Sequence, residues 1–246
     1  MPFAVRSLSP RSALIIVGFD TATDDTVVGA SVDGETVTES VIPPGPEGRP
    51  VHSQGLLGAV TEAAEAAGGW SRIDRIAVGT GPGTFTGIRI GLATANGIAL
   101  STGIELAGVS TLATLARPML GPDHVTLALL DARRGEVFAA LYGPAGEVLR
   151  EPFVCGPDEL ASRIGEFDPG LVVGGPGAVR FREELDRADI ATVGPEAGFN
   201  LLSAGAICEL GASVDSEQLS NPLEPTYLRV PDAQLWLERD GRKAGP

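Results

Sequence analysis

The chain has 246 residues, with 32 acidic side chains against 18 Lys and Arg, and a formal net charge of −14. This length allows one large domain or two small ones with an ample core, and a hydrophobic content of 43% is typical of a soluble globular protein. Free-standing nucleic-acid binding is disfavoured, because phosphate contacts need clustered Lys and Arg. Lys243 is the only lysine, so any contact with RNA would have to be local, Arg-based or made by a partner.

The cysteines and the apolar runs limit chemistry and location. Cys155 and Cys208 have no CxxC motif and no neighbouring histidine, which favours buried thiols over a disulfide scaffold or a zinc site. The longest apolar run near the N-terminus, residues 13–17, is too short for a membrane span or a secretory core. We therefore expect a cytoplasmic protein without membrane contact, preceded by a flexible extension over residues 1–12.

Strand and helix signals alternate along the first half. Residues 13–20 predict a buried strand that turns polar at Asp20, and residues 26–42 predict a hairpin around Asp33-Gly34. Residues 52–68 carry apolar side chains at helical spacing and end at Gly68-Gly69. The expected order is β-β-β-α-β-α-β-α, with further strands at 73–80 and 104–110 and further helices at 86–100 and 111–116.

The second half repeats this order. A strand ends at Asp131 and a hairpin turns around 143–146, at nearly the same offset as Asp20 and Gly34 in the first half. Such a duplication predicts an α/β fold of two similar lobes in the actin-like or sugar-kinase-like manner, each a mixed sheet of β-β-β-α-β-α order flanked by helices. The expected lobes are 13–117 and 118–230, with a tail at 231–246. In the second lobe we expect helices at 157–164, 179–187 and 200–210, a strand at 171–177 and a short strand near 190–194.

Residues 79–97, "GTGPGTFTGIRIGLATANG", form a Gly-rich loop that leads into a helix. The segment has neither the spacing nor the lysine of a Walker loop, and Thr86 stands where a dinucleotide fingerprint needs glycine. Thr84 or Thr86 is expected to cap the helix. Ile88, Leu92, Ala95 and Ala99 form the stripe expected to face the core.

One flank of this helix has almost no side-chain bulk. Gly87, Gly91 and Ala95 recur every four residues, and the helix at 52–68 contains Gly55 and Gly58. Each interior glycine costs about 1 kcal/mol relative to alanine. Such thinned helices make sense where another backbone packs against them. The spacing alone leaves open whether that backbone belongs to the same subunit or to a second protein.

The loop and helix at 79–100 closely resemble the signature of the TsaB family. "FDTAT" (19–23), "HSQGLL" (52–57) and "LLDARRGEVFAALY" (129–142) resemble the family's other motifs in the same order. The resemblance extends from about residue 13 over nearly the whole chain. The N-terminal extension, Gln54 and the glycines at 55 and 58 depart from the family pattern.

The resemblance implies an actin-like, non-catalytic subunit in the formation of threonylcarbamoyladenosine on tRNAs that read codons beginning with A. Its implied partners are the catalytic protein TsaD, the ATPase TsaE and, through the complex, tRNA; without them it is expected to form a homodimer. The implied pairing surface comprises helices 53–67 and 86–100, centred on Leu57, Ile90 and Ala93, so Gly91→Leu is expected to spare the fold and weaken pairing. The full set of expected partner-binding residues is His52, Leu56, Leu57, Thr86, Gly87, Arg89, Ile90, Gly91, Ala93 and Asn96.

Two enzymatic alternatives compete with the subunit interpretation. Related catalytic subunits hold a metal through His-x3-His, whereas Leu56 stands four residues after His52 and the other histidine, His124, lies in the second half. His52 is therefore expected at an exposed helix start, with a partner contact as the alternative. A metallopeptidase-like hydrolase would need that histidine pair or another hydrolytic constellation.

An ATP-dependent kinase-like phosphotransferase is the second alternative. It would use Asp20 and Asp131 at the ends of two strands and "GGPG" (174–177) as a nucleotide loop, but Asp24 and Asp25 would repel a triphosphate. Asp20 is otherwise expected to close an Asx turn, and "GGPG" to be a tight turn. We expect no metal and no cofactor of the chain's own, and a nucleotide at the boundary with the catalytic subunit stays open. Asp20, Arg133 and Arg134 are the candidate residues for a nucleotide; the two arginines are otherwise expected at a solvated hairpin end.

Overall fold

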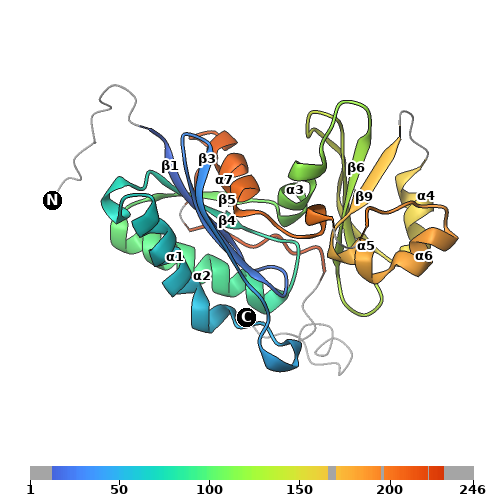
Figure 1. Cartoon of the computed structure of the whole chain (residues 1–246), viewed down its shortest axis with the longest axis horizontal. Helices are drawn as coiled ribbons and strands as arrows, with labels where there is room; N and C mark the ends of the chain where they lie inside the picture. Colours follow the sequence, from blue (N-terminus) through green and yellow to red (C-terminus); the bar gives the residue numbers. More distant parts are fainter. Residues whose placement is uncertain (1–12, 166–169, 195–196, 221, 230–246) are drawn as a thin grey trace, which may run out of the picture.

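The structure is a computed structural model that describes residues 13–165, 170–194, 197–220 and 222–229. Two sheets lie side by side, with strand orders β3-β2-β1-β4-β5 and β8-β7-β6-β9 (Figure 1). The expected tail at 231–246 and extension at 1–12 lie outside the described residues.

The first sheet forms as the hydrophobic pattern predicts. β1 pairs antiparallel with β2 and parallel with β4, and the turn at Asp33-Gly34 takes the left-handed conformation that joins β2 to β3. Its strands are β1 (Ile15–Asp20), β2 (Thr26–Val32), β3 (Glu35–Ile42), β4 (Arg75–Gly79) and β5 (Glu105–Val109).

The second sheet repeats the first. β6 pairs antiparallel with β7 and parallel with β9, as β1 pairs with β2 and β4. The strands are β6 (Val125–Asp131), β7 (Val137–Tyr142), β8 (Val148–Cys155) and β9 (Leu171–Gly174). The internal duplication and the two-lobed actin-like fold expected from the sequence are therefore confirmed.

Helices fill three layers around the two sheets (Figure 1). One layer covers the outer face of the first sheet, a second lies between the sheets, and a third covers the outer face of the second sheet. The first layer consists of α1 (His52–Ala66) and α2 (Phe85–Thr102). The layer between the sheets consists of α3 (Thr111–Ala116) and α7 (Ala204–Ser213). The third layer consists of α4 (Leu160–Ile164), α5 (Pro176–Arg180) and α6 (Arg182–Arg187).

Two expectations for the second half are wrong. Residues 190–194 form no strand in the described chain; Val193 only donates its N–H to the Val173 carbonyl at 2.9 Å. The last helix starts at Ala204 and packs against β1, β2 and β4 of the first lobe. The helix therefore starts four residues later than the expected 200–210. Sequence order does not reveal which sheet an apolar helix will cover, and the expected lobe bounds of 13–117 and 118–230 stay a prediction.

The loop after β1 lies against the start of α2 at a distance that requires glycine. The Thr21 hydroxyl donates to the Gly87 carbonyl at 2.7 Å, and the Thr84 N–H donates to the Ala22 carbonyl at 2.7 Å. A Cβ on Gly87 would overlap the Thr21 carbonyl oxygen, and one on Gly91 would lie 2.5 Å from Thr21 Oγ1. Gly87 and Gly91 therefore leave the space that the loop after β1 of the same chain occupies.

This contact corrects the expectation for the small-residue flank. Gly87 and Gly91 are buried inside the subunit and cannot present a surface to a partner. A leucine at position 91 would collide with Thr21, so the expectation that Gly91→Leu spares the fold is wrong. Thr84 caps the helix as expected, by accepting the Gly87 N–H at 3.2 Å.

A matched pair of alanine substitutions tests the close approach. Gly87→Ala is expected to lower the free energy of unfolding by about 3 kcal/mol or more, because a backbone clash in a packed core forces strain. Gly97→Ala, on the outer side of the same helix with nothing within 4 Å of its Cβ, is expected to raise it by up to about 1 kcal/mol. Urea unfolding followed by circular dichroism measures both, and equal effects would contradict the packing role of Gly87.

Candidate functional site

The junction between the lobes gathers the polar side chains that follow β1 and β6. Asp20 ends β1 and is fully buried. Its Oδ1 accepts the Ala22 N–H at 2.6 Å and its Oδ2 accepts the Thr111 hydroxyl at 2.8 Å. Asp20 therefore closes the Asx turn expected as its structural role and ties β1 to the start of α3.

Burial dominates the electrostatics of Asp20. Desolvation raises its pKa to about 6, and the hydrogen bonds from Ala22 and Thr111 oppose the rise. Each carboxylate oxygen accepts one of these hydrogen bonds inside the core. Gly79 is the reason that the carboxylate fits, because a Cβ there would overlap it.

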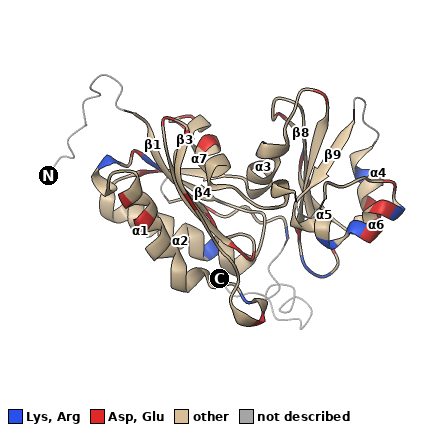
Figure 2. Cartoon of the chain, in the orientation of Figure 1, with Lys and Arg blue, Asp and Glu red and all other residues tan. Residues whose placement is uncertain are grey.

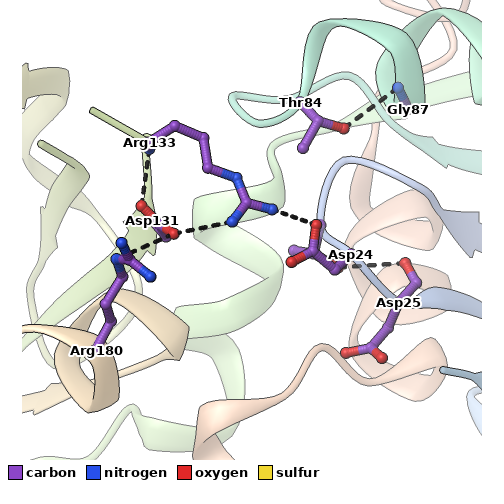
Figure 3. Close-up of polar contacts among 8 residues, drawn as sticks. Asp24, Asp25, Thr84, Gly87, Asp131, Arg133 and Arg180 are labelled. Carbon is purple, nitrogen blue, oxygen red and sulfur yellow. Dashed lines mark hydrogen bonds and ion pairs between the residues drawn. The ribbon is translucent and has the colours of Figure 1, made fainter. Parts of the chain in front are cut away.

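A clasp of charged side chains joins the two lobes at the surface (Figure 3). Arg133, in the turn between β6 and β7, binds Asp24 of the first lobe and Asp131 of its own lobe. Asp131 also lies 3.4 Å from the Nε of Arg180 at the end of α5. The hydrogen bond with Asp24 and the negative charge of Asp24 raise the pKa of Arg133 above its ordinary value. We call Asp24, Asp131, Arg133 and Arg180 the interlobe clasp.

The turn that carries the clasp has an unusual backbone. Arg133 and Arg134 have φ values of 63° and 57°, in the left-handed region that residues with a Cβ rarely adopt. The Arg133 N–H donates to Asp131 Oδ1 at 2.8 Å, and this bond holds the turn in that conformation. Strained turns of this kind concentrate at functional sites.

A small pocket lies beside the interlobe clasp. Only about 50 Å³ of space remains between Asp24, Asp131, Arg133 and Pro176. Residues 174–177 pack tightly on their own lobe, since a Cβ on Gly177 would lie 2.9 Å from the carbonyl carbon of Leu129. The GGPG segment is therefore the tight strand-to-helix turn expected as its structural alternative.

The second candidate region is the side of α1 and α2 that faces away from the first sheet. We call it the outer face. The charged residues of these two helices are Glu62, Glu65 and Arg89, and Figure 2 marks acidic positions on α1. Leu57 and Leu100 are 61% and 87% exposed. Gly58 and Gly97 have nothing within 4 Å of a Cβ, so the chain's own packing does not require these glycines. The outer face comprises Ser53, Gln54, Leu57, Gly58, Ala93, Gly97 and Leu100, all exposed.

The structure places only part of the expected pairing residues on the outer face. Leu57, Thr86 and Ala93 are exposed, and Ile90 is half-buried against the core. Leu56 and His52 are buried, which contradicts both the exposed position and the partner contact expected for His52. His52 Nδ1 instead lies 2.6 Å from Thr26 Oγ1, and burial lowers the pKa of His52.

Two further pairing candidates bind the chain's own C-terminal segment. The Asn96 side chain bonds both the N–H and the carbonyl of Leu223 at 3.0 and 3.4 Å. The Arg89 Nε donates to Tyr227 Oη at 3.0 Å, and its guanidinium lies 3.8 Å from the centroid of the Phe85 ring. Residues 222–229 thus run along the first lobe before reaching the second.

The two histidines lie in different lobes. His52 begins α1 and contacts Thr26 of β2, whereas His124 Nε2 lies 2.7 Å from the Met119 carbonyl oxygen. Within the described residues, no three His, Cys, Asp or Glu side chains are grouped so that they could hold a metal ion. A search of the same part of the chain finds no helix long and apolar enough to cross a membrane.

Comparison with known proteins places this geometry in a family. The structure of an uncharacterized Pseudomonas aeruginosa protein with similarity to peptidase YEAZ matches with a TM-score of 0.72 and 27% identity, over 88% of this chain and all of that one. The Escherichia coli (strain K12) tRNA threonylcarbamoyladenosine biosynthesis protein TsaB is 37% identical over 130 residues. The chain belongs to the TsaB family.

The extent of the likeness differs between relatives. The match to the E. coli protein covers 52% of this chain and 54% of that protein, so it spans about half of the relative's length. An uncharacterized Mycobacterium tuberculosis (strain ATCC 25618 / H37Rv) protein is 32% identical over 184 residues, which cover 74% of this chain and 77% of the relative. A family model described as TsaD, tRNA N6-adenosine threonylcarbamoyltransferase, matches residues 46–165.

The sequence pattern did not lead to the prediction that Arg133, in the motif "DARRGE", binds Asp24. Arg133 and Arg134 are exposed at the hairpin end as expected, but Arg133 also binds Asp24 across the lobe boundary. A usable signal was present, because "DTATDD" and "DARRGE" follow equivalent strands of the duplicated unit. Equivalent strand ends meet at the junction of a two-lobed fold, so their opposite charges could have been paired.

The buried carboxyl of Asp20 predicts a pH-dependent stability. Because the pKa in the fold, about 6, lies above the ordinary aspartate value of 3.8, this group's stabilising contribution is full below pH 3.8 and is lost as pH rises through about 6. Asp20→Asn removes the titration and keeps an oxygen for the Ala22 N–H. The stability of Asp20→Asn relative to the parent should therefore increase between about pH 4 and pH 8, by up to about 3 kcal/mol.

Urea unfolding midpoints of parent and variant, measured across that pH range, test this linkage. Asp33→Asn, at the exposed hairpin turn, serves as the control for removal of a carboxylate. A stability difference between Asp20→Asn and the parent that stays constant with pH would contradict the assigned titration.

Proposed function

We propose that this chain is a non-catalytic subunit in the formation of threonylcarbamoyladenosine on tRNA. It acts by pairing with a TsaD-type catalytic subunit, together with a TsaE-type ATPase, in the cytoplasm, and it meets tRNA through that complex. The names of the E. coli, Bacillus subtilis and Haemophilus influenzae relatives support the process. The single observation that carries the pairing is the outer face of α1 and α2.

The outer face has the physical character of a protein–protein contact. Leu57 and Leu100 expose apolar area that water does not favour. Gly58 and Gly97 each cost about 1 kcal/mol inside a helix, and no contact within the described chain requires them. A partner backbone that packs against the two helices would account for both features. Without the partner, two copies of the chain would cover the same face in a homodimer.

The interlobe clasp argues against the kinase-like alternative. Arg133 is already paired with Asp24 and Asp131, so its charge is not available for the phosphates of ATP. Asp20 is enclosed in the core with both oxygens bonded. Binding of a triphosphate there would require the two lobes to separate. The contribution proposed here is therefore structural: the chain holds the catalytic subunit in its active geometry.

Substitutions on the outer face test the pairing. Leu57→Glu and Gly97→Arg are expected to leave the fold intact and to weaken binding to the metal-loaded catalytic subunit at least about 30-fold, because each places a charge in a desolvated contact. Leu149→Glu, on β8 of the second lobe, is the matched control for an exposed leucine and is expected to bind normally. Isothermal titration calorimetry measures the affinities.

Activity assays with the same proteins distinguish a non-catalytic subunit from an enzyme. Threonylcarbamoyl transfer to tRNA is expected only when this chain and the catalytic subunit are mixed, and it should fall in parallel with affinity in the two outer-face variants. Consumption of ATP or modification of tRNA by this chain alone would overturn the non-catalytic assignment. Unchanged affinity in both variants would overturn the location of the interface.

A further inference from the structure

A cavity larger than the pocket beside the interlobe clasp lies between the two lobes. Its volume is about 420 Å³, inside the range of roughly 300–1,000 Å³ typical of binding sites. Three segments enclose it: the loop that enters α2, the turn between β6 and β7, and residues 226–229. Both lobes therefore contribute to its wall, and we call this cavity the interlobe cleft.

The wall of the interlobe cleft is mainly apolar and aromatic. The rings of Phe85 and Tyr227 stack with centroids 5.2 Å apart, and each of the two residues is 37% exposed. The Arg89 Nε donates to Tyr227 Oη at 3.0 Å and so holds that ring in place. Phe138 of β7 and Leu228 add further apolar surface. A preordered aromatic surface that is still partly open to solvent favours an apolar occupant, above all another aromatic ring.

Charge alone does not define the occupant. The charged side chains of the wall are Arg133, Arg134 and Arg229, and none of the three is without a partner. The arginines therefore do not form an open anion site. None of the described lining residues is Asp or Glu, so these residues would not repel an acidic segment that enters the cleft.

The described chain ends at the wall of this cleft. Residues 222–229 run along the first lobe, and the last four of them line the cleft. The Arg229 guanidinium donates to the Ala132 carbonyl of the second lobe at 2.9 Å, which fixes the last described residue at the wall. Residues 230–246 follow in the sequence from that point.

The sequence that follows Arg229 has the composition that the cleft favours. "VPDAQLWLE" (230–238) contains three large apolar residues in a row, and Trp236 is the only aromatic residue after Tyr227. Its only charged residues are Asp232 and Glu238, opposite in sign to the arginines of the wall. Trp236 lies seven positions after Arg229. A chain of that length spans at most roughly 25 Å when extended, so the indole ring can reach the cleft that the chain has just left.

We propose that Trp236, in the chain's own C-terminal segment, docks in the interlobe cleft. Its indole ring packs against the Phe85–Tyr227 pair, and the acidic residues on either side of it lie toward the arginines of the wall. Because both lobes form that wall, the docked segment acts as a strap that joins them. Tethering close to the cleft gives the ring a local concentration on the order of 1 mM, so even a weak contact is populated. The docking does not depend on the pairing proposed for the outer face.

Competition by a synthetic peptide tests the docking. A peptide of residues 230–246 is titrated into the full-length parent and into full-length Trp236→Ala by isothermal titration calorimetry. The variant leaves the cleft open, so we expect it to bind the peptide with a dissociation constant on the order of 0.1 mM. The parent should bind at least about tenfold more weakly, because its own tethered Trp236 competes. Equal affinities for parent and variant, or no binding to either up to about 1 mM, would overturn the proposal.

A substitution in the wall locates the contact. Phe85→Ser, made in the Trp236→Ala chain, removes one ring of the stacked pair and should weaken peptide binding at least about tenfold. Phe199→Ser is the matched control, because Phe199 is 40% exposed on the second lobe and is not among the described residues of the wall. Circular dichroism and unfolding midpoints verify that both variants are folded. Unchanged peptide affinity in folded Phe85→Ser would contradict the cleft as the docking site.

Fluorescence identifies which copy of the chain supplies the ring. Trp70→Phe leaves Trp236 as the only tryptophan. Its quenching by acrylamide should be at least about threefold weaker than in the free peptide, because such clefts bury roughly 70–90% of the surface of an occupant. This protection should not change with protein concentration. Quenching as strong as in the peptide would count against docking, and protection that appears only at high protein concentration would assign the cleft to the segment of a second copy instead.

Discussion

The close contact between the loop after β1 and the start of α2 determines the rest of the structure. Gly87 admits the Thr21 carbonyl, and Thr84 binds the Ala22 carbonyl in the same place. Because the helix is fixed there, Asp20 is enclosed in the core and Asp24 emerges at the lobe boundary. The opposite side of α2 is left exposed beside α1. One contact therefore determines which residues are core, which join the lobes and which face outward.

The second lobe is joined to this frame by charge and by backbone. Arg133 binds an aspartate from each lobe, and its left-handed turn remains strained even in this closed arrangement. Ion pairs between exposed groups contribute little individually, about 0–1 kcal/mol, so the clasp orients the lobes more than it stabilises them. Stability of the arrangement comes from α3 and α7, whose apolar side chains fill the space between the two sheets.

The sequence predicts the fold better than it predicts the surfaces. Hairpin turns, strand order and the duplication follow from local patterns, and the structure confirms them. The side to which a glycine faces does not follow from spacing, because Gly87 and Gly97 lie on the same helix and only their neighbours in space distinguish them. The same limit applies to α7, which is apolar in either lobe. His52 appeared exposed because a helix start is usually solvated, whereas here Thr26 accommodates it in the core.

α2 connects the core of the first lobe to the face proposed for pairing. Its first turn is held by the loop after β1, where the Thr21 hydroxyl donates to the Gly87 carbonyl and the Thr84 N–H donates to the Ala22 carbonyl. Its outer side, with Ala93, Gly97 and Leu100, is exposed. A partner on the outer face would therefore contact a helix that its own subunit already holds in place, so pairing would cost little ordering of this helix.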